Sequence, residues 1–166
     1  FVALADETRA RELVRRLDSL TTEVGWGSEG VRQAAADTGA DMVVSAIVGG
    51  AGLVPTMAAL RAGKTLALAN KETLVMAGAL VTAEARARGT RILPVDSEHS
   101  AIFQCLDDGE TGSVRRIVLT ASGGPFRTLP QKAFAAITPD DALRHPTWSM
   151  GKKITMPMVC ATRAVE

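Results

Sequence analysis

One stretch of the sequence decides the fold class: residues 42–60, which are MVVSAIVGGAGLVPTMAAL. Residues 42–48 are rich in β-branched side chains, as strands are. Three glycines and Pro55 then interrupt the stretch, and residues 57–60 favour a helix. A membrane-spanning helix needs about 20 apolar residues, and this much Gly and Pro at its centre would leave backbone groups unsatisfied in lipid. We therefore predict a buried strand, a glycine turn and a helix, and no membrane segment.

The same alternation of strand and helix continues on both sides of this stretch. Further strands are expected at residues 1–4, 65–69 and 91–95, and helices at residues 6–17, 30–38, 53–62 and 71–88. This is the pattern of parallel βαβ units, so we predict a doubly wound α/β domain over residues 1–94. Beyond Pro94 the pattern changes to a helix at 97–106, a polar turn at 107–113, a strand at 116–121 and a Gly/Pro-rich loop. Residues 95–166 are therefore assigned to a second domain of a different kind.

Composition narrows the class of protein further. The chain has 166 residues, 46% hydrophobic and 22% charged, which is typical of a globular protein. Its net charge of +1 gives no field that favours nucleic acid or an acidic membrane as partner. Cys105 and Cys160 stand in unrelated contexts, which supports neither disulfides nor a zinc site and fits a reducing, cytosolic compartment. The chain begins within a predicted strand at Phe1, so we expect it to be a piece of a longer protein.

Ligands of open parallel sheets bind beyond the carboxyl ends of the strands, so the residues after each strand are candidates for a site. Asn70, Lys71 and Glu72 follow one strand and offer an amide, an ammonium and a carboxylate. The alternative is a solvated helix start capped by Asn70. The glycines within residues 49–52 either cradle a phosphate or let a helix pack closely on the sheet.

A pair of carboxylates follows the next predicted strand. Asp96 and Glu98 are hard oxygen ligands two residues apart, which suits Mg²⁺ or Mn²⁺ better than Zn²⁺, and His99 stands beside them. The alternative is helix capping by Asp96 or Ser97.

Two later loops have features of ligand sites. Ser122 with the two glycines after it could surround an anion with N–H and O–H donors, or form a plain turn. Residues 145–153 combine His145, Trp148, Gly151 and two lysines, which favours a mobile lid over a ligand, with an exposed loop as the alternative.

Taken together and in order, these segments resemble the 1-deoxy-D-xylulose 5-phosphate reductoisomerase family of non-mevalonate isoprenoid biosynthesis. The segments that carry the resemblance are AIVG with GL within residues 46–53, LANKE at 68–72, LPVDSEH at 93–99, SGGPFR at 122–127 and HPTWSMGKKI at 145–154. The resemblance implies a partial Rossmann-like parallel-sheet domain followed by the start of an α+β catalytic domain. Residues 156–166 depart from the family pattern. The family's glycine-rich cofactor loop and third metal carboxylate have no counterpart here, so we expect the isolated chain to be inactive.

The resemblance also implies an activity and a set of residue roles. Enzymes of the family use NADPH and Mn²⁺ or Mg²⁺ to rearrange and reduce 1-deoxy-D-xylulose 5-phosphate to 2-C-methyl-D-erythritol 4-phosphate. Asp96 and Glu98 match metal ligands, and Asn70, Glu72 and Gly151 match NADPH contacts. The matches to substrate-binding positions are Lys71, Ser97, Glu98, Ser122 and His145, of which Lys71, Glu98 and His145 are the catalytic candidates, while Trp148 and Met150 match the lid.

For the whole protein the resemblance implies a homodimer in the cytosol, or in the plastid of a eukaryote, that binds a phosphorylated sugar and neither nucleic acid nor a membrane. Two alternatives stay open: another nicotinamide-linked dehydrogenase, since homoserine-dehydrogenase-like proteins also place Asn-Lys after such a strand, and a non-catalytic module that binds metal or phosphate. The Asp96 and Glu98 pair, with Ser122 and its glycines, counts against the other dehydrogenase.

Overall fold

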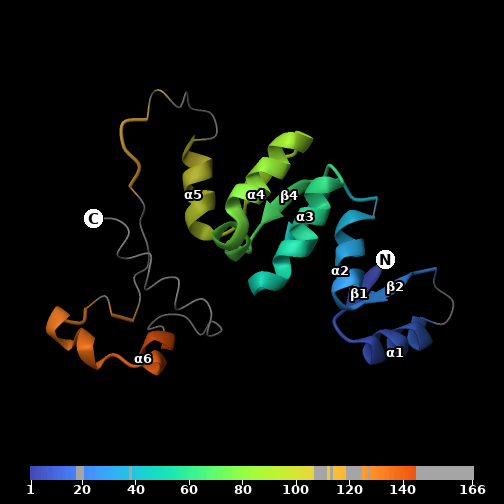
Figure 1. Cartoon of the computed structure of the whole chain (residues 1–166), viewed down its shortest axis with the longest axis horizontal. Coiled ribbons are helices and arrows are strands. Elements are labelled where there is room, and N and C mark those ends of the chain that lie inside the picture. The colour runs from blue at the N-terminus through green and yellow to red at the C-terminus, as the bar shows by residue number, and fades with distance from the viewer. Residues whose placement is uncertain are drawn as a thin grey trace. The chain divides into compact units, whose positions relative to one another are not determined.

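The structure is a computed structural model that describes residues 1–17, 21–37, 39–106, 112, 114–118, 125–126 and 128–144. The chain divides into two compact units, Phe1–Gln104 and Cys105–Glu166. Strands and helices alternate along the first unit (Figure 1). Its elements are β1 (Val2–Leu4), α1 (Glu7–Leu17), β2 (Val24–Trp26), α2 (Gly27–Ala36), β3 (Met42–Ser45), the 3-10 helix η1 (Gly49–Gly52), α3 (Leu53–Arg61), β4 (Thr65–Leu68), α4 (Glu72–Arg88) and β5 (Ile92–Pro94), after which α5 (Ser97–Leu106) begins.

Every strand pair in the first unit is parallel. β1 pairs with β2, and β4 lies between β3 and β5 in a second sheet. The predicted α/β class with parallel strands is therefore confirmed, as is the sequence of strand, glycine turn and helix across residues 42–60. Among the helices that the structure describes, none is both long enough and apolar enough to cross a membrane.

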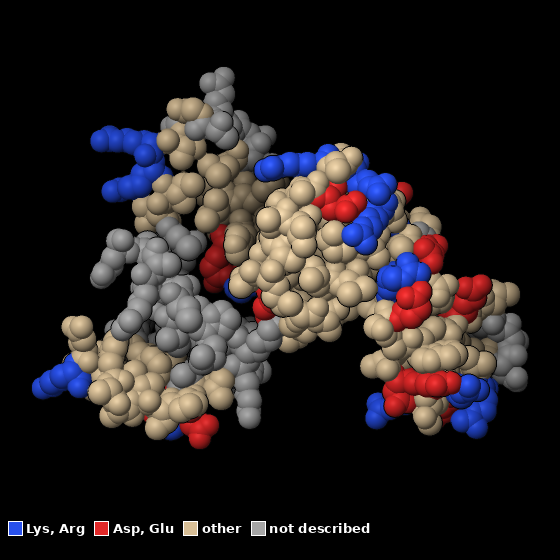
Figure 2. All heavy atoms as spheres, viewed as in Figure 1, with Lys and Arg blue, Asp and Glu red and all other residues tan. Residues whose placement is uncertain are grey.

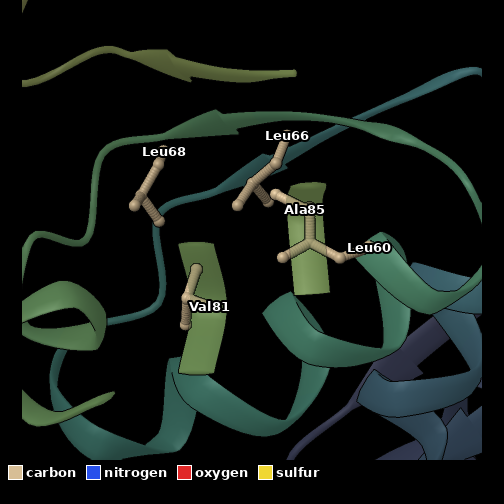
Figure 3. Close-up of a cluster of buried hydrophobic side chains, with 5 residues drawn as sticks. All are labelled: Leu60, Leu66, Leu68, Val81 and Ala85. Carbon is tan, nitrogen blue, oxygen red and sulfur yellow. The ribbon is translucent and has the colours of Figure 1, made fainter. Parts of the chain in front are cut away.

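The main core lies between β4 and the helices α3 and α4. Leu66 and Leu68 extend from one face of β4 toward Val81 and Ala85 of α4, and Leu60 of α3 lies beside them (Figure 3). Three of these side chains, Leu60, Leu66 and Val81, are 0% exposed. Burial of a leucine contributes about 1.5–3 kcal/mol relative to the exposed state, so this cluster holds both helices on the sheet.

α2 connects the two sheets, because it packs on β1 and β2 and also on α3. The contact with β2 requires glycine at two positions. A Cβ atom at Gly30 would lie 2.8 Å from the carbonyl carbon of Gly25, and one at Gly25 would lie 3.0 Å from Cα of Gly30. The two backbones can approach this closely only without side chains between them.

An ion-pair group joins the far ends of α3 and α4. Glu84 on α4 accepts from Arg88 at 3.1 Å and from Arg61 of α3 at 3.4 Å. Hydrogen bonds from Arg88 and then Arg61 lower the pKa of Glu84, so the carboxylate is ionised over the neutral range. On the face that Figure 2 shows, acidic and basic side chains of the first unit also stand next to one another.

Two local expectations were wrong, and both errors concern strands. β2 was not expected, because Val24, Gly25 and Trp26 form no β-branched run; its pairing with β1 and the close approach of α2 stabilise it. Of the strand expected at residues 116–121, the structure describes residues 116–118, which are exposed and belong to neither a sheet nor a helix. β-branched residues favour a strand only where a neighbouring strand accepts their hydrogen bonds, and residues 119–121 lie outside the described part.

The described part of the second unit contains a 3-10 helix, η3 (Gln131–Ala136), and a short helix, α6 (Pro139–Leu143), neither of which was expected. α6 begins with a capping box: Asp141 N–H donates to Thr138 Oγ1 at 3.2 Å, and Thr138 N–H donates to Asp141 Oδ2 at 3.0 Å. Hydrogen bonds from Thr138 lower the pKa of Asp141. The sequence Thr-Pro-Asp-Asp carries the signal for such a start.

We expect Leu60→Ala to lower the free energy of unfolding by about 2–5 kcal/mol. The substitution leaves a cavity in the buried cluster, and the surrounding structure relaxes only partly to fill it. Leu80→Ala is the matched control. Leu80 lies on α4 but is 67% exposed, so its loss should change stability by no more than about 0.5 kcal/mol. Urea unfolding followed by circular dichroism measures the free energy of unfolding of both variants. Equal losses of stability would show that the core lies elsewhere.

Candidate functional site

The carboxyl ends of β4 and β5 bring two sequence motifs together. Leu68 at the end of β4 is in register with Pro94 at the end of β5, and Val95 N–H donates to Leu68 O at 3.0 Å, one residue beyond the strand. Lys71 is the third residue after the end of β4, and Asp96 is the second residue after the end of β5. The parallel pairing therefore places an ammonium beside a carboxylate.

The side chains at this edge form a small charged cluster. Nζ of Lys71 lies 3.3 Å from Oε2 of Glu98 and 3.8 Å from Oδ2 of Asp96. The same Oδ2 atom lies 2.6 Å from Nδ1 of His99. The Asp96 side chain is the most buried of the four, 11% exposed, whereas that of His99 is 54% exposed. Two carboxylates thus share one ammonium in a partly desolvated site.

The local chain path explains why the carboxylates converge. Ser100 N–H donates to Asp96 O at 2.9 Å, so the first turn of α5 begins directly after β5. Glu98 lies in that first turn, where the unpaired N–H groups of a helix favour negative charge. One helix start therefore turns both carboxylates toward Lys71.

The donor set of this cluster suits a hard divalent cation, since carboxylate oxygens are the preferred ligands of Mg²⁺ and Mn²⁺. The ammonium of Lys71 shows that a cation is accepted between the two oxygens. Within the described ranges, no group of three or more His, Cys, Asp and Glu side chains is arranged to hold a metal. Asp96 and Glu98 would therefore form a two-carboxylate part of a site.

Asn70 joins this edge to the turn after β3. Its side chain is 4% exposed, and Nδ2 donates to the carbonyl oxygens of Ile47 and of Gly49, the latter at 2.9 Å. Its backbone N–H donates to Ser45 O at 3.1 Å. The N-cap of α4 is Lys71, which has no side-chain capping bond, so Asn70 is a clamp between loops rather than the helix cap considered above. Its Oδ1 atom is buried and has no hydrogen-bond partner among the described residues.

Gly52 leaves the space that the Asn70 amide occupies. A Cβ atom at Gly52 would lie 2.3 Å from Asn70 Nδ2 and 3.0 Å from Ile47 O. The backbone of Gly52 is right-handed helical, with φ −74°, so space and not conformation requires glycine there. This contact agrees with the close-packing alternative for the glycines of residues 49–52.

The structure describes only part of the predicted site. Glu72 is half-buried in the first turn of α4, and Ser97 is exposed at the first residue of α5, so both lie at the same edge as Lys71. Ser122, His145 and Gly151 lie outside the described residues, as do Trp148 and Met150 of the expected lid. Their roles stay predictions.

Lys71 and the pair of carboxylates belong to two separate motifs of the sequence, and their contact was not predicted. The signal for it was the order of the strands. Consecutive parallel strands usually pair with each other, and their carboxyl ends then lie at one edge. The hydrogen bond between Ser45 and Thr56 was not predicted either. Their hydroxyl oxygens lie 3.0 Å apart in the core beneath this edge.

Comparisons with known proteins agree on one family. The sequence profile described as 1-deoxy-D-xylulose 5-phosphate reductoisomerase matches residues 1–78, and that of the family's C-terminal domain matches residues 92–162. The reductoisomerase of Prosthecochloris aestuarii is 53% identical over 156 residues, 94% of this chain and 41% of its own length. That of Symbiobacterium thermophilum is 58% identical over 134 residues, 81% of this chain and 34% of its own length.

Solved structures agree with the sequence matches. The reductoisomerase from Zymomonas mobilis in complex with NADPH has a TM-score of 0.81 at 44% identity, covering 98% of this chain and 42% of that one. DOX-P reductoisomerase in complex with NADPH, fosmidomycin and magnesium has a TM-score of 0.79 at 38% identity, covering 98% of this chain and 43% of that one. The chain thus spans less than half the length of the proteins it matches.

We expect Gly52→Ala to lower the free energy of unfolding by about 1–3 kcal/mol, because the new methyl group must displace the Asn70 amide from its two carbonyl partners. Gly50→Ala is the control in the same turn. Its Cβ atom would meet the methyl end of Met76 at 3.2 Å, a side chain that can move, so the change should stay within about 1 kcal/mol. Chemical denaturation compares the two variants, and an unaffected Gly52→Ala chain would contradict the clamp.

Proposed function

Because the chain belongs to the 1-deoxy-D-xylulose 5-phosphate reductoisomerase family, we propose that its protein converts 1-deoxy-D-xylulose 5-phosphate to 2-C-methyl-D-erythritol 4-phosphate with NADPH and a divalent metal ion. The observation that carries the proposal is the cluster of Lys71, Asp96 and Glu98 at the carboxyl ends of β4 and β5. It places two hard oxygen ligands and a hydrogen-bond donor around one point, at the edge where α/β proteins bind ligands.

Asp96 and Glu98 would hold the metal ion. When bound, a divalent ion polarises the carbonyl oxygen and the neighbouring hydroxyl of a substrate for rearrangement of its carbon skeleton. His99 donates from Nδ1 to Asp96 Oδ2 at 2.6 Å, which orients the carboxylate. A solved relative described as a complex with magnesium supports this assignment for the chain.

Asn70 supplies the contact to NADPH that the geometry supports best. The cofactor supplies the hydride for the reduction. The amide nitrogen of Asn70 donates both of its N–H groups to backbone carbonyl oxygens. The buried Oδ1 atom has no donor among the described residues. A buried acceptor of this kind costs stability until a donor reaches it, and a cofactor amide or hydroxyl would be that donor. Glu72, two residues farther along the chain, is the second expected contact.

Lys71 would bind the substrate beside the metal ligands, since an ammonium donates to hydroxyl and phosphate oxygens alike. Ser97 stands next to Glu98 at the start of α5 and is exposed. From the resemblance we also assign substrate contacts to Ser122 and His145 and a cofactor contact to Gly151. A homodimer, a cytosolic or plastid location and the domain boundary near residue 94 belong to the same proposal.

A chimeric enzyme tests the activity. Residues 1–155 of this chain would replace the matching segment of the reductoisomerase of Chlorobaculum tepidum, which is 54% identical over 156 residues. We expect the chimera to oxidise NADPH with 1-deoxy-D-xylulose 5-phosphate and Mn²⁺ at a rate on the order of 1 s⁻¹ or more. A folded chimera that binds NADPH and does not turn over would refute the proposed function.

Within that chimera, Asp96→Asn should lower kcat by about 100-fold or more, because it removes a metal ligand and not merely a residue that orients one. Asp41→Asn is the matched control: Asp41 is an exposed carboxylate before β3, on the opposite side of β4 from β5, and should leave the rate unchanged. If both variants kept full activity, Asp96 would not be a metal ligand.

A Mn²⁺ titration of the 166-residue chain itself tests the metal site without turnover. Electron paramagnetic resonance measures free Mn²⁺, and the wild-type chain and Asp41→Asn should bind one ion that Asp96→Asn does not. Affinity should be weak, because the described residues supply only two carboxylate ligands. Equal binding by all three chains would remove the proposed site.

A further inference from the structure

Lys71 occupies the oxygen atoms that a metal ion would take. Its Nζ atom approaches Oε2 of Glu98 and Oδ2 of Asp96, at 3.3 and 3.8 Å, and its side chain is 34% exposed. Among the described residues, the other nitrogen group that lies within 4 Å of these carboxylates is the imidazole of His99, which contacts Asp96. The ammonium is thus the main balance for two partly buried negative charges.

An ammonium and a divalent ion cannot both hold these oxygens. Mg²⁺ lies about 2.1 Å from its oxygen ligands, and Mn²⁺ only slightly farther, so an ion that bridges the two carboxylates would come close to the present position of Nζ. The two positive charges would then repel each other across a short distance in a partly desolvated site.

Hydrogen bonds hold the backbone of Lys71 in place, whereas its side chain can adopt another rotamer. Lys71 O accepts from Leu74 N–H at 3.0 Å and Val75 N–H at 3.1 Å, which holds the residue at the N-cap of α4. The four-carbon stem of lysine allows Nζ to leave the carboxylates without any change in that backbone.

Resting on the metal site of the proposed function, we infer that Lys71 is an internal counter-ion that Asp96 and Glu98 exchange for the divalent ion. Without metal, its ammonium keeps the two carboxylates together and prevents their mutual repulsion. With a divalent ion held by Asp96 and Glu98, Nζ of Lys71 would leave the carboxylates and would be available to donate to a substrate oxygen. The same lysine thus preserves the empty site and serves the filled one, and it lowers the affinity for the metal as a consequence.

The test is Mn²⁺ binding to the full 166-residue chain, measured by electron paramagnetic resonance. Lys71→Met removes the internal competitor and should bind Mn²⁺ about tenfold more tightly than the wild-type chain. Arg88→Met is the control, because it removes one positive charge at the opposite end of α4, and it should bind as the wild type does. Equal affinity of Lys71→Met and the wild type would overturn the inference.

A second measurement uses the unaltered chain, in case Lys71→Met does not fold. The side-chain signal of Lys71 in a chain labelled with ¹³C-lysine, assigned by its loss in Lys71→Arg, should move as Mg²⁺ is added, because Nζ leaves the carboxylates. A signal that stays unchanged while Mg²⁺ binds would overturn the exchange and leave the metal site intact. Binding of Mn²⁺ to Asp96→Asn as tight as to the wild type would instead refute the metal site of the proposed function.

Discussion

β4 is hydrogen-bonded on both sides, and the ladders continue past its last residue. The N–H groups of Ala69 and Asn70 donate to Ser45 O at 3.0 and 3.1 Å, and Leu68 O accepts from Val95 N–H at 3.0 Å. These bonds fix where the chain leaves β3, β4 and β5 relative to one another. The positions of Asn70, Lys71 and Asp96 all follow from that register, because each stands within three residues of a strand end.

Buried polar groups then make the edge rigid. The Asn70 amide lies where a side chain at Gly52 would be, and it satisfies two backbone carbonyl groups of the turn after β3. An unpaired buried polar group costs about 1–3 kcal/mol, so this turn depends on one asparagine and on the absence of one methyl group. An edge held by side chains in this way keeps its shape before any ligand binds, which is what precise positioning of a ligand requires.

The charged cluster has the opposite character, because one long and flexible side chain holds its two carboxylates together. Lys71 satisfies two carboxylates through a long, flexible stem, whereas Asn70 is locked by short bonds. One loop thus carries, on adjacent residues, an amide fixed by hydrogen bonds and an ammonium held by ion pairs. The parallel sheet supplies the position of that loop, and the chemistry resides in the residues carried on it.

The sequence by itself determined the elements that depend on neighbouring residues. The β-branched run of β3, the glycine turn before α3 and the polar residues after β4 and β5 were all predicted, because local preference and apolar periodicity are properties of a short stretch of chain. Only the tertiary structure decided the rest. β2 exists because β1 and α2 pack against it, and residues 116–118 form no strand although one was predicted there. Lys71 meets Asp96 and Glu98, the latter 27 residues farther along the chain, because β4 and β5 pair in register. Contacts between segments distant in the sequence depend on which strands pair with each other. No local sequence pattern specifies that pairing.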